Sequence, residues 1–203
     1  MSYDFTKLKK NLEQKGYQVH IFDTKEEASK YLDNQIDGKT VGMGGSVTLH
    51  QLEIYEKLAP HNTVYWHDEK PEHMTIAETR QAATRSEVYI SSVNGISEAG
   101  EIVNIDHTGN RVAAIAFGPE EVYLVLGENK VAPDLEAAMH RARNIAAPLN
   151  AKRLNRKTPC AVKADRCYDC KSPERICRNF SVLTDKPAGA KYVVLLVRET
   201  LGY

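Results

Sequence analysis

Helical and strand patterns alternate along the chain up to residue 93, and this alternation constrains the fold more than any other feature. Apolar residues recur at helical spacing in four segments, and a short strand-like run follows each of them. The expected helix and strand pairs are, in chain order, residues 5–15 and 17–22, 24–36 and 39–43, 47–59 and 63–66, and 74–85 and 88–93. A repeated helix–strand order is typical of a mostly parallel sheet with helices on both faces. The sequence therefore predicts an α/β fold.

The pattern changes after residue 93. Residues 101–106 and 111–117 both have strand character, and residues 107–110 between them have the composition of a hairpin turn. Residues 122–126 then form a continuous apolar run, which suits a strand buried on both faces. We therefore expect a hairpin followed by another strand of the central sheet.

The last part of the chain combines a long helix with a loop-rich stretch. Pro133 and Asp134 open a helical pattern, which we expect to be interrupted near Pro148. Residues 155–182, called here the cysteine segment, have little periodicity, and residues 192–197 supply a last strand. No repeat or Pro/Gly-rich linker divides the chain, so we predict a single domain over residues 1–203 with the cysteine segment as an insertion before the last strand.

Composition excludes several classes of protein. The 203 residues are 42% hydrophobic and 27% charged, which is ordinary for a globular domain. Lys and Arg total 27 and Asp and Glu total 27, so the formal charge of zero gives no overall attraction to nucleic acid or membrane. The apolar runs are far shorter than the ~18 residues of a membrane helix. We expect a cytoplasmic protein that contacts no membrane.

A glycine-rich turn lies where an expected strand gives way to a helix. It contains Gly42, Gly44, Gly45 and Ser46. Glycines let backbone N–H groups converge, and a following helix adds the positive end of its dipole, so an anion would fit there. The spacing matches neither the dinucleotide fingerprint nor the P-loop. A tight turn without a ligand is the alternative explanation.

A run of short polar side chains begins where the strand at residues 88–93 ends. Open α/β sheets bind ligands at this edge, so these side chains are candidates to line a crevice. The candidate ligand-binding residues are Asn94, Asn104, Asp106, Asn110 and Arg111. Glu98 lies in the same run and is the candidate catalytic carboxylate, as a general base or a nucleophile. The alternative is that the glycines and Asn94 shape turns and that Glu98 is solvated.

All four cysteines of the chain lie within 18 residues. They are Cys160, Cys167, Cys170 and Cys177. Such clustering in a reducing compartment indicates metal binding before disulfides, and a tetrathiolate suits zinc or an iron–sulfur cluster. We therefore predict that the four thiols hold one metal centre, with free or disulfide-paired cysteines as the alternative.

Basic residues surround the cysteines. Residues 141–178 contain eleven basic and three acidic residues, a net charge of +8. Lys and Arg would offset the negative charge of a tetrathiolate centre. A zinc-ribbon-like nucleic-acid or partner-binding module is another explanation, although only Tyr168 and Phe180 could stack on bases.

Five segments together resemble the LUD-domain, or lactate-utilisation, family, in its subgroup with a C-terminal four-cysteine segment. They are VGMGGS (41–46), NGISEAGEIVNID (94–106), GNRV (109–112), NIAAPLNAKR (144–153) and SPERICR (172–178). The resemblance implies a fold like that of ribose-5-phosphate isomerase, glucosamine-6-phosphate deaminase and the CoA transferases. It also implies that the glycine turn is the anion loop and that Glu98 lies where CoA transferases place their glutamate nucleophile.

Three functions from different classes follow. The first is a component of lactate or organic-acid oxidation that binds a small anionic metabolite and a metal centre. The resemblance implies iron–sulfur oxidoreductase subunits as its partners, and a homodimer is left open. The second is an isomerase or CoA-transferase-type enzyme that uses Glu98 and holds a structural zinc. The third is the nucleic-acid or partner-binding module, which the aromatic content makes the least favoured. Whether the chain is an enzyme is left open.

Overall fold

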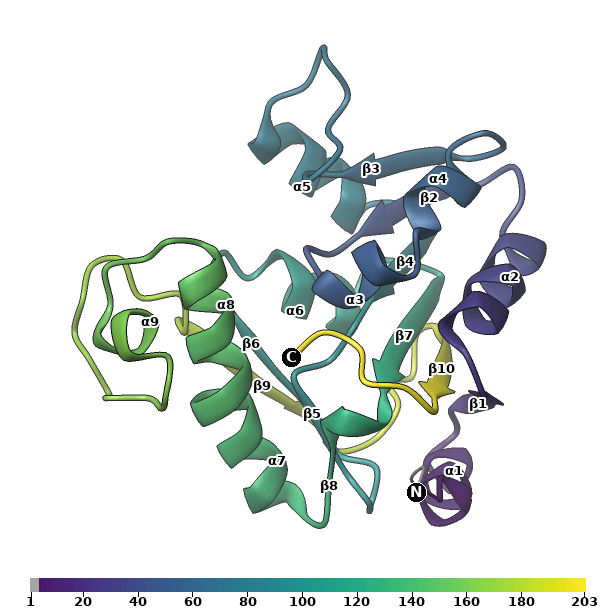
Figure 1. Ribbon diagram of the computed structural model, residues 1–203. Coiled ribbons are helices and arrows are strands. Elements are labelled where there is room, and N and C mark those ends of the chain that lie inside the picture. Colours follow the sequence, from purple (N-terminus) through teal and green to yellow (C-terminus); the bar gives the residue numbers. More distant parts are fainter. Residues whose placement is uncertain (1–3) are drawn as a thin grey trace.

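Six parallel strands form the central sheet of the computed structural model, which describes residues 4–203 (Figure 1). Their order across the sheet is β1 (Gln18–Phe22), β10 (Lys191–Val197), β7 (Glu121–Gly127), β4 (Val88–Ser91), β2 (Thr40–Met43) and β3 (Thr63–Trp66). The register pairs Val193 of β10 with both Gln18 of β1 and Tyr123 of β7. The predicted α/β fold with a mostly parallel sheet is confirmed.

Helices cover both faces of this sheet, because alternate strand residues point to opposite sides. One face packs against α1 (Thr6–Gln14), α5 (Ile76–Thr84) and α6 (Asn110–Ala116). The other packs against α2 (Lys25–Gln35), α3 (Val47–Gln51) and α4 (Ile54–Leu58). Along β10, Val194 belongs to the first of these cores and Leu195 to the second, and both side chains are fully buried.

A second sheet of four strands lies beside the first. Its order is β8 (Val131–Ala132), β5 (Gly95–Ser97), β6 (Ile102–Asp106) and β9 (Asn179–Leu183), and β6 runs antiparallel to both of its neighbours. A continuous helical rod packs on it, as Figure 1 shows, made of α7 (Leu135–Arg141), the π-helical turn η2 (Ala142–Ala146) and α8 (Ala147–Arg153). The short 3-10 turn η1 (Glu128–Lys130) connects the two sheets.

The expected strand over residues 111–117 is wrong, because this segment forms helix α6. The carboxylate of Asp106 accepts hydrogen bonds from the backbone N–H groups of Arg111, at 2.9 Å, and Val112, at 3.3 Å. Gly109 enters the helix with a φ of 92°, which glycine adopts without strain. A capping carboxylate four residues before the helix and a left-handed glycine therefore replace the expected hairpin with a turn into a helix.

Two long helices also depart from their simplest form. The expected helix over residues 47–59 is divided into α3 and α4 at Glu53, whose φ is 50°. The rod on the second sheet widens into the turn η2 immediately before Pro148, which is the region of the expected interruption. Proline lacks the N–H that would bond the preceding turn, and a wide turn accommodates this loss without ending the rod.

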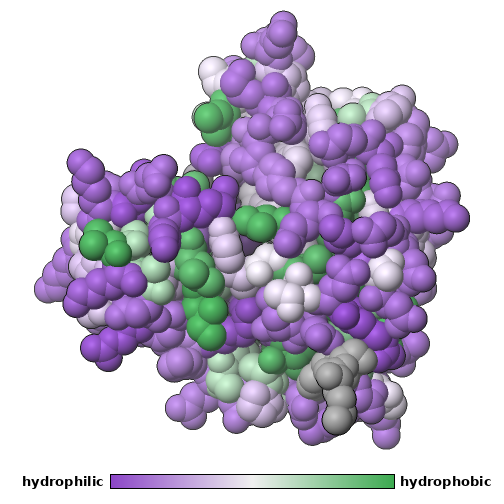
Figure 2. All heavy atoms as spheres, in the orientation of Figure 1, coloured by the Kyte–Doolittle hydropathy of each residue, from purple (hydrophilic) through white to green (hydrophobic). Residues whose placement is uncertain are grey.

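The cysteine segment is the loop-rich insertion that the sequence predicts. It contains the short helix α9 (Pro159–Lys163) and leads into β9, ahead of the last strand β10. Figure 2 shows a mostly hydrophilic surface, with a narrow hydrophobic band along the rod of α7 and α8. Three partly exposed side chains, Met139, Ile145 and Leu154, belong to this rod and its end. Within residues 4–203, no helix is long and apolar enough to cross a membrane.

Candidate functional site

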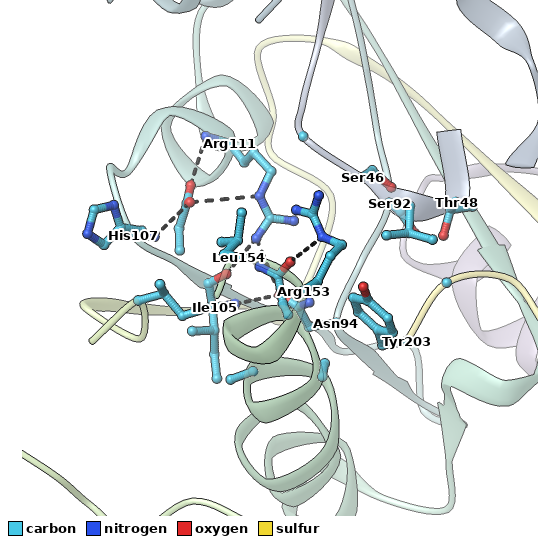
Figure 3. Close-up of a pocket in the computed structure, with 18 of the residues that line it drawn as sticks. Ser46, Thr48, Ser92, Asn94, Ile105, His107, Arg111, Arg153, Leu154 and Tyr203 are labelled. Carbon is cyan, nitrogen blue, oxygen red and sulfur yellow. Dashed lines mark hydrogen bonds and ion pairs between the residues drawn. The ribbon is translucent and has the colours of Figure 1, made fainter. Parts of the chain in front are cut away.

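A pocket of about 310 Å³ opens between the two sheets (Figure 3). The turn after β2 supplies Gly45 and Ser46, and the segment after β4 supplies Ser92 and Asn94. The end of β6 supplies Asp106, while α8 and the chain after it close the opposite side. The pocket thus lies at the carboxyl ends of parallel strands, where open α/β sheets bind ligands. Its volume suits a small metabolite.

Cations dominate the pocket wall. Five basic residues, four of them arginines, line it against two carboxylates, Asp68 and Asp106. The basic residues are Arg80, Arg111, Lys130, Arg153 and Arg156. The Nε atoms of Arg80 and Arg156 are buried and have no hydrogen-bond partner within residues 4–203. A buried guanidinium N–H without an acceptor is costly to the fold, and no acceptor among the described residues offsets that cost here.

Asp106 and Arg111 organise the end of the pocket at β6 and α6. Besides capping α6, the Asp106 carboxylate accepts from the backbone N–H of His107 at 2.8 Å. Arg111 donates to the carbonyl of Ile105 at 2.5 Å, and its Nε lies 3.8 Å from Asp106. The Oδ1 of Asn94 accepts from the Ile105 N–H at 2.8 Å. The structure therefore brings these three predicted residues together, and much of their bonding holds the pocket wall in place.

Lys130 is a pocket residue that the sequence interpretation missed. It lies at the end of η1, is 3% exposed, and donates to Ser92 Oγ at 2.7 Å and Thr48 Oγ1 at 3.0 Å. Burial, followed by the charges of Arg141 and Arg111, lowers the pKa of Lys130 well below its ordinary value. Its position three residues after the apolar strand β7, at the ligand-binding edge of the sheet, is the signal that could have identified it.

His67 lines the same pocket opposite the glycine turn. Burial lowers the pKa of its imidazole, Asp68 opposes this effect, and the charges of Arg80 and Arg111 reinforce it. The ring is therefore held in its neutral form more strongly than a solvated histidine.

The glycine turn divides between structural and pocket-facing positions. Gly42 lies in β2, where a Cβ would overlap the carbonyl oxygen of Ala83 in α5, so this glycine permits close helix–sheet packing. The Gly44 N–H already donates to the Ile90 carbonyl at 3.0 Å. Only Gly45 and Ser46 of the predicted anion loop line the pocket, and the Ser46 hydroxyl caps α3 by accepting from the Leu49 N–H.

Of the remaining predicted polar residues, one lines the pocket and one does not. Asn110 lines the pocket, whereas Asn104 is buried in the middle of β6 and does not line it. The Asn104 Oδ1 atom is buried and has no hydrogen-bond partner within the described residues 4–203. Asn104 therefore lies apart from the crevice that the sequence analysis assigned to it.

Glu98 does not line the pocket, so the expected placement beside the glycine turn is not found. Its Oε2 lies 2.5 Å from Lys7 Nζ, and its carbonyl accepts from Asn11 of α1 at 2.7 Å. Because β5 and β6 are antiparallel, Glu98 lies near the start of β6 and Asp106 at its end, about 16 Å apart over five strand residues. The catalytic role of Glu98 stays a prediction that no contact with the pocket supports.

The four cysteines line one small, largely apolar cavity between α8, α9 and the loops of the cysteine segment. About 10 Å³ of space is left in it, enough for about one water-sized atom. The sulfur atoms have donors beside them: the Asp169 N–H donates to Cys167 Sγ at 3.3 Å, and Arg175 donates to Cys177 Sγ at 3.5 Å. These donors are of the kind that stabilise thiolates around a metal.

The donor set fits a thiolate metal centre in chemical type. A hydrogen bond to Cys167 raises the pKa of Arg143, and one to Cys177 raises the pKa of Arg175, so two guanidinium groups lie against the sulfurs. The spacing does not yet form a coordination shell. In the part of the chain from residue 4 onward, no three His, Cys, Asp or Glu side chains are close enough together to hold one ion. Metal binding would have to draw the thiols together.

Comparison with known proteins agrees with this architecture. A solved structure of a DUF162 family protein from Deinococcus radiodurans superimposes with a TM-score of 0.52, at 12% sequence identity, over 94% of each chain. At this identity the likeness concerns the fold alone. No curated protein matches the sequence. The LUD domain family matches residues 5–197, nearly the whole length, and the chain therefore belongs to the LUD domain family.

Proposed function

We propose that the pocket binds a small anionic metabolite. The observation that carries this proposal is the set of four arginines that line the pocket against two carboxylates. A carboxylate or phosphate would accept hydrogen bonds from guanidinium groups and would offset the excess positive charge. The N–H groups of Gly45 and Ser46 lie at the same wall and could add backbone donors.

The metabolite class that we propose is a short organic acid of the lactate and pyruvate type. A pocket of about 310 Å³ is at the small end of the range for metabolite sites, which favours a compact ligand. We further propose, from the resemblance to lactate-utilisation proteins, a role as a component of lactate or organic-acid oxidation, with iron–sulfur oxidoreductase subunits as partners. On this proposal the chain binds the acid or its oxidation product beside a redox protein.

Calorimetric titration with L-lactate, pyruvate and inorganic phosphate tests the pocket. We expect Arg80→Gln to weaken binding of the preferred anion by about tenfold or more, because a charge-assisted hydrogen bond contributes ~1.5–3 kcal/mol. Arg85→Gln is the matched control, since Arg85 is an exposed arginine just after the same helix and does not line the pocket. Equal affinities in the two variants, or no binding of any of the three anions, would contradict the proposal.

We also propose that the four cysteines hold one metal centre. Their shared cavity, the nearby guanidinium groups and the N–H donors to sulfur support it. Four thiolates suit either a single zinc ion or an iron–sulfur cluster. Anaerobic purification followed by metal analysis and a visible spectrum separates the two: one zinc per chain indicates a structural site, and iron with inorganic sulfide indicates redox chemistry. Protein that holds no metal while all four thiols react freely would overturn this proposal.

A further inference from the structure

The surroundings of Lys130 differ from those of an ordinary buried lysine. Buried lysines are usually paired with a carboxylate, and none lies within ion-pair distance of Lys130 among residues 4–203. Its Nζ instead contacts two hydroxyl oxygens, Ser92 Oγ and Thr48 Oγ1. The residue also lines the anion pocket, so a ligand can reach it.

The number of partners matches an uncharged amine. An ammonium group has three N–H donors, whereas a neutral amine has two donors and one lone pair. Ser92 and Thr48 provide two acceptors, and both residues are buried. With the two hydrogens directed to these hydroxyls, the nitrogen keeps its lone pair for a third direction.

The positive charges near Lys130 also favour its uncharged form. Arg141 is anchored by hydrogen bonds to the carbonyls of Asn129 and Asn94, and Arg111 is anchored to that of Ile105. Burial is the largest cause of the lowered Lys130 pKa, and the positive charges of Arg141 and Arg111 add to it. Lysines activated for covalent chemistry are desolvated and placed beside other cations in this way.

We propose that Lys130 is a nucleophilic amine that forms an imine with small 2-oxo carboxylates in this pocket. The inference rests on the proposed anion site and names its ligand class. The guanidinium groups hold the carboxylate, and the amine meets the carbonyl carbon next to it. A short oxo acid has both groups on adjacent carbons, which suits a pocket of about 310 Å³.

The step is a condensation without oxidation or reduction. The Lys130 Nζ lone pair forms a bond to the carbonyl carbon, and the carbon–oxygen π electrons move to oxygen, which takes up a proton. The nitrogen then loses its protons as the carbon–nitrogen double bond forms, and the oxygen leaves as water. One amine and one ketone thus give one imine and one water, and hydrolysis reverses the reaction.

Reductive trapping tests the proposal on the unmodified full chain. The protein is incubated near neutral pH with pyruvate and sodium cyanoborohydride, and the labelled lysines are located by peptide mass spectrometry. We expect a carboxyethyl group on Lys130 at a rate at least about tenfold above that of exposed Lys30, since each unit by which a pKa is lowered gives about ten times more free amine. Lys130→Met should lose this label, and Lys30→Met should keep it.

Competition with L-lactate separates this inference from the anion site. Lactate has the carboxylate but no carbonyl, so it should bind in calorimetry and slow labelling of Lys130 without affecting Lys30. If lactate binds but Lys130 reacts no faster than Lys30, the imine proposal is wrong and the anion site stands. If neither acid binds and Lys130 is not labelled, both proposals are wrong. Mapping on the unmodified chain keeps the test decisive even where Lys130→Met does not fold.

Discussion

The central sheet and the cysteine segment are held in place by different means. Strands β7 and β10 are continuous apolar runs that are buried on both faces and contribute to two large cores. The cysteine segment contributes Ala161 and Ile176 to a small core with Ala151 of α8, and Cys160 packs against it. Apolar burial alone therefore accounts for the sheet, whereas the segment has too little of it to fix its loops. If the four thiols hold a metal, as we propose, the order of these loops should depend on that metal as well.

Truncating one large side chain in each region should give the largest difference in unfolding free energy between the central sheet and the cysteine segment. Leu195 is fully buried at the centre of the sheet, so Leu195→Ala should lower the free energy of unfolding by about 2–5 kcal/mol. Ile176→Ala removes a similar volume from the small core, where local opening limits its effect on the whole molecule. Chemical denaturation followed by circular dichroism measures both. Equal losses would show that the two regions unfold as one unit.

The next effect concerns a glycine that the sequence analysis assigned to ligand binding. Gly42→Ala should destabilise the protein by about 1–3 kcal/mol, because the new methyl group would overlap the Ala83 carbonyl and separate α5 from β2. Gly189→Ala is the matched control, since a Cβ there has no neighbour within 4 Å among the described residues. Thermal unfolding in the absence of ligand measures the difference. A stable Gly42→Ala variant with weakened anion binding would restore Gly42 to the site.

A smaller effect on global stability is expected at the thiols. Cys167→Ser should abolish stoichiometric metal binding and increase proteolysis within residues 155–182, because metal binding is coupled to local folding. The unfolding transition of the sheet should change little, since Cys167 belongs to neither of the two large cores. Limited proteolysis with and without a chelator is the measurement. A large loss of global stability would instead tie the segment to the sheet.

The contrast between long apolar strands and segments held by specific contacts also explains which parts of the fold the sequence could predict. Each strand of the central sheet is a local apolar run, so its order with the helices can be recognised without tertiary information. Strands β5 and β8 are three and two residues long and exist through their pairing with neighbours. Residues 110–116 could suit a strand or a helix by composition, and the carboxylate of Asp106 decides in favour of the helix. Very short strands depend on pairing with other strands, and the cap of α6 depends on where the Asp106 side chain points, and the apolar pattern contains neither.

The candidate site was predictable in part for a related reason. Asn94 follows parallel strand β4 and lines the pocket, as the rule for open α/β sheets predicts, and there it meets Asp106 at the end of β6 and Arg111 in α6. Glu98 was assigned to the same crevice because it is close to Asn94 in sequence, but β5 carries it to the opposite end of β6. Lys130 follows a strand end as well, but no sequence motif distinguishes this lysine from the others. Its importance comes from burial, which only the folded chain reveals.

The smallest predicted effect uses pH to ask whether the pocket carries unmet positive charge. His67 has a pKa below its ordinary value of 6.5, first because it is buried and then because of Arg80 and Arg111. As the pH falls through about 6.5 the unfolded chain takes up a proton that the folded chain resists, so folding loses stability between that pH and the lower folded pKa. His67→Gln should remove this loss, which is measured as the difference in unfolding free energy between the two proteins across that window. Phosphate in the pocket should diminish the difference, because a bound anion would offset the arginine charges and make protonation of His67 easier. If the unfolding free energy depends on pH in the same way in both proteins, with and without phosphate, the charge of the pocket does not affect protonation of His67.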